Sequence, residues 1–107
     1  MAQYRIAPTE PAEVDLRGIH HYIAVDLANP IAADRLEDEL NDAIIKLEDM
    51  PRRFPLVDIP KYRAMGYRKM VVSDDYIVLY TIDETQRVVF VERVTNARRD
   101  WVRLLLL

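Results

Sequence analysis

Apolar side chains recur every three or four positions along two stretches in the first half of the chain. The first stretch, residues 10–27, follows Thr9, a residue type that caps helix N-termini, and has acids and a proline in its first turn. The second, residues 30–50, follows Asn29, which is also a good cap, and begins with Pro30. The spacing predicts two amphipathic helices joined by a tight break, and therefore a helical hairpin. The expected apolar stripes are Ala12, Leu16, Ile19, Ile23 and Leu27 on the first helix, and Ala33, Leu36, Leu40, Ala43, Ile44, Leu47 and Met50 on the second.

The pattern changes in the second half of the chain to short apolar runs separated by polar turns. These runs are rich in Val, Ile and Tyr, which favour strands. The connections between them, Ser73-Asp74-Asp75 and residues 83–86, have the length of hairpin turns. Three strands are therefore predicted, at residues 67–72, 76–82 and 87–95.

The remaining segments are shorter. Residues 4–7 alternate and stop at Pro8, which predicts a first strand. Residues 51–66 contain three prolines and little periodicity, so we expect a loop. Residues 98–107 are expected to form a short terminal helix.

The side chains of residues 76–82 indicate how these elements pack. Tyr76, Val78, Tyr80 and Ile82 would face one side of the sheet, and Ile77, Leu79 and Thr81 the other. One set must cover the helices, and the other is too apolar to be fully solvated, so a partner or the C-terminal helix should cover it. The prediction is an α+β fold: an N-terminal strand and a helical hairpin packed on an antiparallel sheet of about four strands, with a short C-terminal helix.

Composition narrows the chemistry. The 107 residues predict a single domain, residues 1–107, and the absence of Cys excludes disulfides, zinc fingers and thiol nucleophiles. With only two Gly, no glycine-rich phosphate loop can be written, and we expect no cofactor. His20 and His21 point about 100° apart on a helix and cannot hold one metal together, so no metal site is expected. The sequence has neither a membrane-length apolar run nor a signal-peptide pattern, which predicts a cytoplasmic protein without a membrane partner.

The net charge of −3 hides an asymmetry. Residues 1–50 carry four cations and eleven acids, a balance of −7, whereas residues 51–107 carry eleven cations and seven acids, a balance of +4. The two ends of the molecule should therefore present opposite fields. The basic half is either ordinary solvated surface or a face for an anionic partner, nucleic acid or an acidic protein segment.

A series of short motifs lies along the chain in a fixed order and spacing. The motifs are Tyr4-Arg5-Ile6, Asp15-Leu16, Tyr22-Ile23, Asn29-Pro30, Gly66-Tyr67-Arg68, residues 75–83, Val89-Phe90-Val91, Arg93-Val94 and Arg98-Arg99-Asp100-Trp101. In these motifs the chain resembles the RelE/ParE superfamily of bacterial type II toxins, the plasmid-stabilisation type. This resemblance implies a compact toxin, a cognate antitoxin that neutralises it in a hetero-oligomer, and either DNA gyrase or the ribosome and its mRNA as target.

The superfamily divides by mechanism, and the residues can be compared with both branches. The resemblance implies that nuclease members place cations at the positions of Ile77 and of Ala97, or of Arg98 if the alignment slips by one. A basic residue of the nuclease set is kept as Arg68, but the resemblance implies that an aromatic or His-Tyr general acid near the C-terminus is replaced by Trp101 and Arg103. The indole of Trp101 donates no proton as an acid. This incomplete set favours the ParE-like branch, which inhibits gyrase and has no hydrolytic chemistry.

Three functions therefore stay open: a gyrase inhibitor, which is slightly favoured and is not an enzyme; a ribosome-dependent endoribonuclease; and a degenerate, non-toxic binding module. If the chain is a nuclease, its catalytic candidates are Arg68 and Arg98. The expected target- or phosphate-binding residues are Arg68, Arg93, Arg98 and Arg99. The expected antitoxin-binding residues are Ile77, Leu79 and Trp101.

Overall fold

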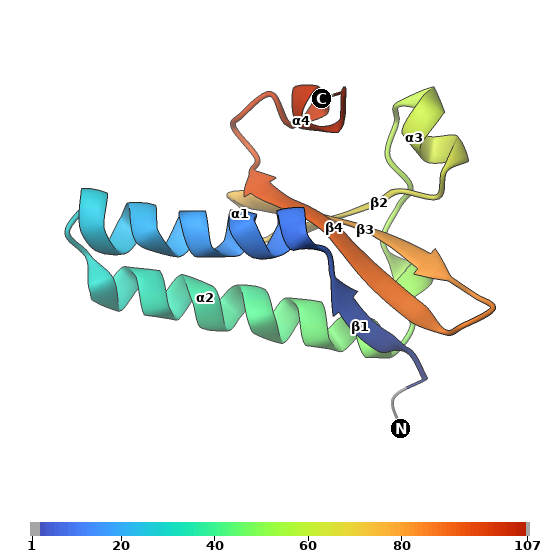
Figure 1. Ribbon diagram of the computed structural model, residues 1–107, viewed down its shortest axis with the longest axis horizontal. Helices are drawn as coiled ribbons and strands as arrows, with labels where there is room; N and C mark the ends of the chain where they lie inside the picture. The colour runs from blue at the N-terminus through green and yellow to red at the C-terminus, as the bar shows by residue number, and fades with distance from the viewer. Residues whose placement is uncertain (1–2, 107) are drawn as a thin grey trace.

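A four-stranded sheet separates two layers of helices (Figure 1). The computed structural model describes residues 3–106. The α1–α2 hairpin covers one face of the sheet, and α3 and α4 lie over the other (Figure 1). The elements are β1 (Arg5–Pro8), α1 (Glu10–His21), the π turn η1 (Tyr22–Asp26), α2 (Pro30–Ile45), the 3-10 turns η2 (Lys46–Glu48) and η3 (Pro51–Arg53), α3 (Pro60–Ala64), β2 (Arg68–Val72), β3 (Tyr76–Asp83), β4 (Val88–Asn96) and α4 (Trp101–Leu106).

The two helix caps of the hairpin are those that the sequence predicts. The Thr9 side chain accepts a hydrogen bond from the backbone N–H of Ala12, and the Asn29 side chain accepts one from Ala32. The end of the first helix differs, because η1 replaces the last α-helical turn with i→i+5 hydrogen bonding, from Leu27 N–H to Tyr22 O at 2.9 Å. The extra residue in this turn rotates the following side chains, so Leu27 is exposed and not on the apolar stripe.

The sheet has the strand order β1-β4-β3-β2. β3 pairs antiparallel with both β2 and β4, as expected for strands joined by short turns. β1 runs parallel to β4, so the sheet is mixed and not wholly antiparallel. A parallel pair needs a long connection, which the hairpin and the two intervening strands supply. The α+β class, the hairpin and the C-terminal helix are confirmed; the last predicted helical residue, Leu107, lies outside the described residues.

Both faces of β3 are buried, each against a different layer. Val78 and Tyr80 pack with Leu40 and Leu47 of the hairpin side, and Ile77 and Leu79 pack with residues of α3 and α4. The predicted division of β3 into two faces is therefore confirmed, and the C-terminal helix covers the second face together with α3.

Two further predictions, for residues 51–66 and for Met50, are wrong. Residues 51–66 are not a plain loop, because η3 and α3 each begin at a proline, which fits the first turn of a helix and lacks only an N–H that has no helical partner there. Met50 is exposed and not on the stripe of the second helix, because α2 ends at Ile45 and Met50 takes a left-handed conformation after η2.

This layering gives the charge asymmetry a direction in space. The helix α2 carries five acids and one cation, whereas α3 and residues 97–106 carry five cations and one acid between them, on the other side of the sheet (Figure 1). Within residues 3–106, none of the helices combines the length and the apolar character that crossing a bilayer requires.

Candidate functional site

The C-terminal segment, residues 97–106, folds back over the sheet after β4 and closes its second face. Leu105 is buried in the same cluster as Ile77 and Leu79, and its carbonyl accepts a hydrogen bond from the Tyr62 hydroxyl of α3. Trp101 lies half-buried, with the Lys69 ammonium 5.5 Å from its ring centroid. These contacts fix the segment on the sheet and leave its arginines on the outside.

Three arginines project from this segment. The Arg98 side chain is 85% exposed, and its Nη2 lies 3.6 Å from Asp75; Arg103 Nε lies 3.9 Å from Asp100. Exposed pairs at such distances contribute little, so the guanidinium groups can leave them for an anionic partner. Arg99 is exposed, and among residues 3–106 it makes no ion pair. We call the exposed arginines Arg98, Arg99 and Arg103 the cationic surface.

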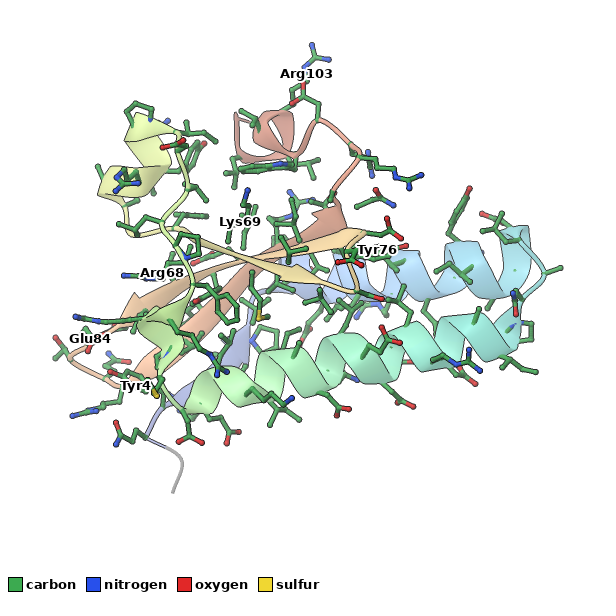
Figure 2. The ribbon with its side chains drawn as sticks, turned by 180° about the vertical axis from the view of Figure 1, so that it is seen from behind. Tyr4, Arg68, Lys69, Tyr76, Glu84 and Arg103 are labelled. Atoms are coloured by element: carbon green, nitrogen blue, oxygen red, sulfur yellow. The ribbon has the colours of Figure 1, made fainter. Side chains whose placement is uncertain are left out.

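Arg68 does not belong to that surface, although the sequence analysis groups it with Arg98 and Arg99. Its Nη1 donates to the backbone carbonyls of Arg52, at 3.1 Å, and Phe54, at 2.6 Å. Arg68 and Met70 are two positions apart in β2, so their side chains lie on the same face of the sheet. Met70 packs toward the hairpin, and this is the face opposite α4. Figure 2 shows Arg68 apart from the α4 segment that carries Arg103. Arg68 therefore holds residues 52–54 in place and does not share a surface with Arg98 and Arg99.

Arg93 is also held by the protein itself. Its Nε and Nη2 donate to the Asp15 carboxylate at 2.8 and 3.0 Å, and this hydrogen bonding raises the pKa of Arg93 above its usual range. The same carboxylate accepts the backbone N–H of Val94 at 3.0 Å. The pairing of β4 with β1 ends at Val91. Beyond that point, Asp15 accepts a backbone N–H of β4 that β1 leaves without a partner. We call these hydrogen bonds of Asp15 with Arg93 and Val94 the edge clamp, because they fix the edge of β4 to α1.

The sequence analysis missed Asp15 as a structural residue. The available signal was its place three residues after Ala12 and four before Ile19, on the apolar side of α1. An acid at such a position must either leave the stripe or find a partner. Thr9 acts beside it, with its N–H donating to Val91 O at 3.0 Å and its hydroxyl to Glu92 O at 3.1 Å.

The predicted antitoxin-binding residues are placed differently from the expectation of an open sheet face. Ile77 is 3% exposed and Leu79 is 0% exposed, because α3 and α4 cover both. A partner cannot contact these two side chains in this arrangement, which corrects the prediction. Trp101 keeps part of its surface accessible.

A cavity of about 610 Å³ opens beside the cationic segment, between α1 and the end of β4. Its walls are mainly apolar and include Val14, Gly18, Tyr22, Tyr76 and Leu104, while Arg99 also lines it. Burial raises the pKa of the Tyr76 phenol, which therefore stays protonated at neutral pH. We call this the α1 cavity.

Two carboxylates, those of Asp75 and Asp100, lie at the cationic surface beside Arg98 and Arg103. The one cluster of three possible metal ligands among residues 3–106 is His20, Asp34 and Glu37, on the hairpin. His20 Nε2 lies 2.8 Å from Asp34 and 3.5 Å from Glu37, and the hydrogen bond with Asp34 raises the pKa of His20. An exposed ion pair accounts for this arrangement without a metal ion.

Solved structures with the same fold include three toxin–antitoxin complexes. The ParDE system from P. aeruginosa gives a TM-score of 0.70 at 14% identity, covering 90% of this chain and 98% of that one. A RelBE-type complex from Mycobacterium tuberculosis gives 0.65 at 20% identity, covering 88% and 98%. The intact RelBE complex from E. coli gives 0.56 at 21% identity, covering 90% and 99%. At these identities the likeness establishes the fold.

Sequence comparison is more specific. Among curated protein sequences, no relative matches at a significant level. The family described as the ParE toxin of type II toxin–antitoxin systems, parDE, matches residues 6–101, which include β1 from its second residue, strands β2 to β4 and both hairpin helices. The chain therefore belongs to the ParE toxin family of type II toxin–antitoxin systems.

Proposed function

We propose that this toxin inhibits DNA gyrase by binding it, without cutting a nucleic acid, and that a cognate antitoxin holds it inactive in the cytoplasm. The observation that carries the proposal is the burial of Ile77. The resemblance to the superfamily places a catalytic cation of the nuclease members at this position, on an open sheet face. Here the side chain is apolar, 3% exposed and covered by α4.

The other groups that cleavage would need do not converge. RNA cleavage through the 2′-hydroxyl requires a proton acceptor, a proton donor for the leaving oxygen and fixed cations around one phosphate. Arg68 is engaged by backbone carbonyls on the hairpin face, and Ala97 carries no charge. Each missing charge-stabilising donor costs about 10²–10³ in rate. With two absent at once, cleavage would be negligible.

The exposed arginines of residues 97–106 support a binding role. They lie on the positive side of a molecule whose hairpin is strongly negative, so an acidic surface of the target would approach this side first. We propose Arg98 and Arg99 as target-binding residues, with Arg103 as an addition. Arg68 and Arg93 act in this proposal through the fold and not through target contact.

An antitoxin partner is supported by two observations. The chain belongs to a family of toxins from type II toxin–antitoxin systems. The three solved structures named above, which share its fold, are of toxin–antitoxin systems. We propose that this chain likewise forms a hetero-oligomer with its own antitoxin.

The experiment is a gyrase supercoiling assay with purified toxin and relaxed plasmid. Wild-type toxin is expected to inhibit supercoiling, and the Arg98→Glu and Arg99→Glu variants to raise the inhibitory concentration by about tenfold or more. The matched control is Arg35→Glu, which makes the same charge change on exposed α2, on the other side of the sheet. Undiminished supercoiling with folded wild-type toxin would refute the proposal and leave the ribosome-dependent nuclease and the degenerate module as the alternatives.

A further inference from the structure

Gly18 occupies the middle of α1, where glycine is unfavourable. A glycine in a helix interior destabilises the helix because the unfolded backbone has more freedom to lose. The structure contains no internal reason for it: a Cβ built on Gly18 meets nothing within 4 Å, and its φ is not in the positive region. Gly18 therefore leaves open space on the surface of α1, where a molecule outside the chain can approach the helix backbone closely.

Gly18 lies at the α1 cavity between two large apolar side chains. Val14 and Tyr22 are one helical turn before and after it, both line the cavity, and both are about half exposed. The absent side chain leaves a notch between them on the surface of α1. In η1, the turn that follows, Val25 is exposed as well. Exposed apolar surface of this extent is typical of a face that a partner covers.

The cavity also contains an unsatisfied buried polar group. Thr95 lines it and is 4% exposed, and its Oγ1 has no hydrogen-bond partner among residues 3–106. Buried hydroxyl groups are almost always paired in folded proteins, since an unpaired one costs free energy. The unpaired hydroxyl of Thr95 thus belongs to a residue that lines the cavity, and no contact among residues 3–106 accounts for it.

Charge at the cavity defines the chemistry of the occupant. Arg99 lines the cavity and belongs to the cationic surface, whereas the one acid in the lining, Asp15, is already bound to Arg93. A complementary occupant has apolar side chains for the space between Val14 and Tyr22 and a carboxylate for Arg99. The backbone of the occupant must also come close to Gly18, which a helix or an extended strand with a small residue at that point allows.

We propose that the α1 cavity is the seat of an acidic, amphipathic segment of the cognate antitoxin, packed against Gly18. This inference rests on the proposed function, because it takes the antitoxin as the partner. The apolar walls favour the antitoxin over gyrase: permanent partners cover apolar surface continuously, whereas contacts with a transient target are more polar. The seat leaves Arg98 and Arg103 outside the cavity.

Because the chain has no cysteine, a single cysteine reports on this surface without interference. Gly18→Cys is alkylated with iodoacetamide alone and with the antitoxin encoded by the adjacent reading frame. The antitoxin is expected to slow the reaction at residue 18 by about tenfold or more. The matched control is Asp38→Cys on the exposed side of α2, whose alkylation rate should not change. A complex that forms while residue 18 keeps its full reactivity would overturn the proposal.

The other possible occupants give distinct results. Protection that rises with the toxin's own concentration would assign the cavity to a second copy, and protection by gyrase without antitoxin would assign it to the target; either overturns the proposal. Gyrase inhibition by wild-type toxin is scored separately. If the toxin does not inhibit gyrase while the antitoxin still protects residue 18, the proposed target is wrong and the proposed antitoxin site at the α1 cavity is retained.

A filling substitution gives a second measurement. Gly18→Trp places a large side chain in the notch, and we expect it to weaken antitoxin binding by about 30-fold or more, the scale of an interface hot spot. Gly18→Ala, which adds one methyl group in open space, should raise the melting temperature and weaken binding less. Unchanged affinity of a folded Gly18→Trp toxin would contradict the seat.

Discussion

Removing the Asp15 carboxylate should destabilise the toxin more than removing any exposed acid of the hairpin. The carboxylate accepts three hydrogen bonds, two from Arg93 and one from the Val94 backbone, and its side chain is only 14% exposed. Breaking a fully buried ion pair costs about 3–5 kcal/mol. Arg93 is 25% exposed and can recover some hydration, so we expect Asp15→Ala to cost about 2–3 kcal/mol.

The assay is urea unfolding followed by far-UV circular dichroism. Glu13→Ala, an exposed acid on the same helix, is the control and should cost less than about 1 kcal/mol. A double-mutant cycle with Arg93→Ala isolates the pair, for which we expect a coupling of about 1–3 kcal/mol. A loss below about 0.5 kcal/mol for Asp15→Ala, or a coupling near zero, would refute the edge-clamp interpretation.

Three further predictions concern the core and titration. Leu40→Ala, in the hairpin core, should cost about 2–5 kcal/mol in the same unfolding assay, and a loss under about 0.5 kcal/mol would place it outside the core. Burial raises the pKa of Tyr80 to about 12. The buried neutral phenol therefore contributes fully to the free energy of unfolding below pH 10, and this contribution is lost as the pH rises toward 12. Alkaline unfolding should therefore start earlier in wild type than in Tyr80→Phe, relative to each protein's neutral stability. The pKa of His20, measured by NMR, should lie above 6.5 and fall in Asp34→Asn, and an unchanged pKa would contradict the hydrogen bond. The stabilisation of the fold by protonated His20 is present below pH 6.5 and is lost as the pH rises through the folded-state pKa.

The parts of the fold that depend on local chemistry were accessible from the sequence. Thr9 and Asn29 start helices because their side chains replace missing backbone partners, and that effect acts within one turn. The alternation along β3 likewise assigns Ile77 and Val78 to opposite faces, since side-chain direction in a strand has a period of two.

Other features depend on contacts between distant residues. The parallel pairing of β1 with β4 joins residues about eighty positions apart, and no local pattern encodes it. The same holds for Arg93, whose partner Asp15 lies 78 positions away, and for Arg68, which binds carbonyl groups that any sequence would supply. Counting arginines in the sequence therefore overestimated the cationic surface, because it could not separate guanidinium groups that hold the fold from those that face outward.

The most direct test of the account is the fate of mRNA when the toxin is expressed in cells without its antitoxin. Primer extension on ribosome-bound transcripts, together with a reporter of DNA damage, separates the two mechanisms in one culture. We predict intact transcripts, arrested replication and an induced damage response, since Ile77 and Ala97 leave the sheet without the cations that cleavage requires. Codon-phased cuts that disappear in Arg68→Ala, in a protein that still folds, would contradict the account and establish a ribosome-dependent nuclease.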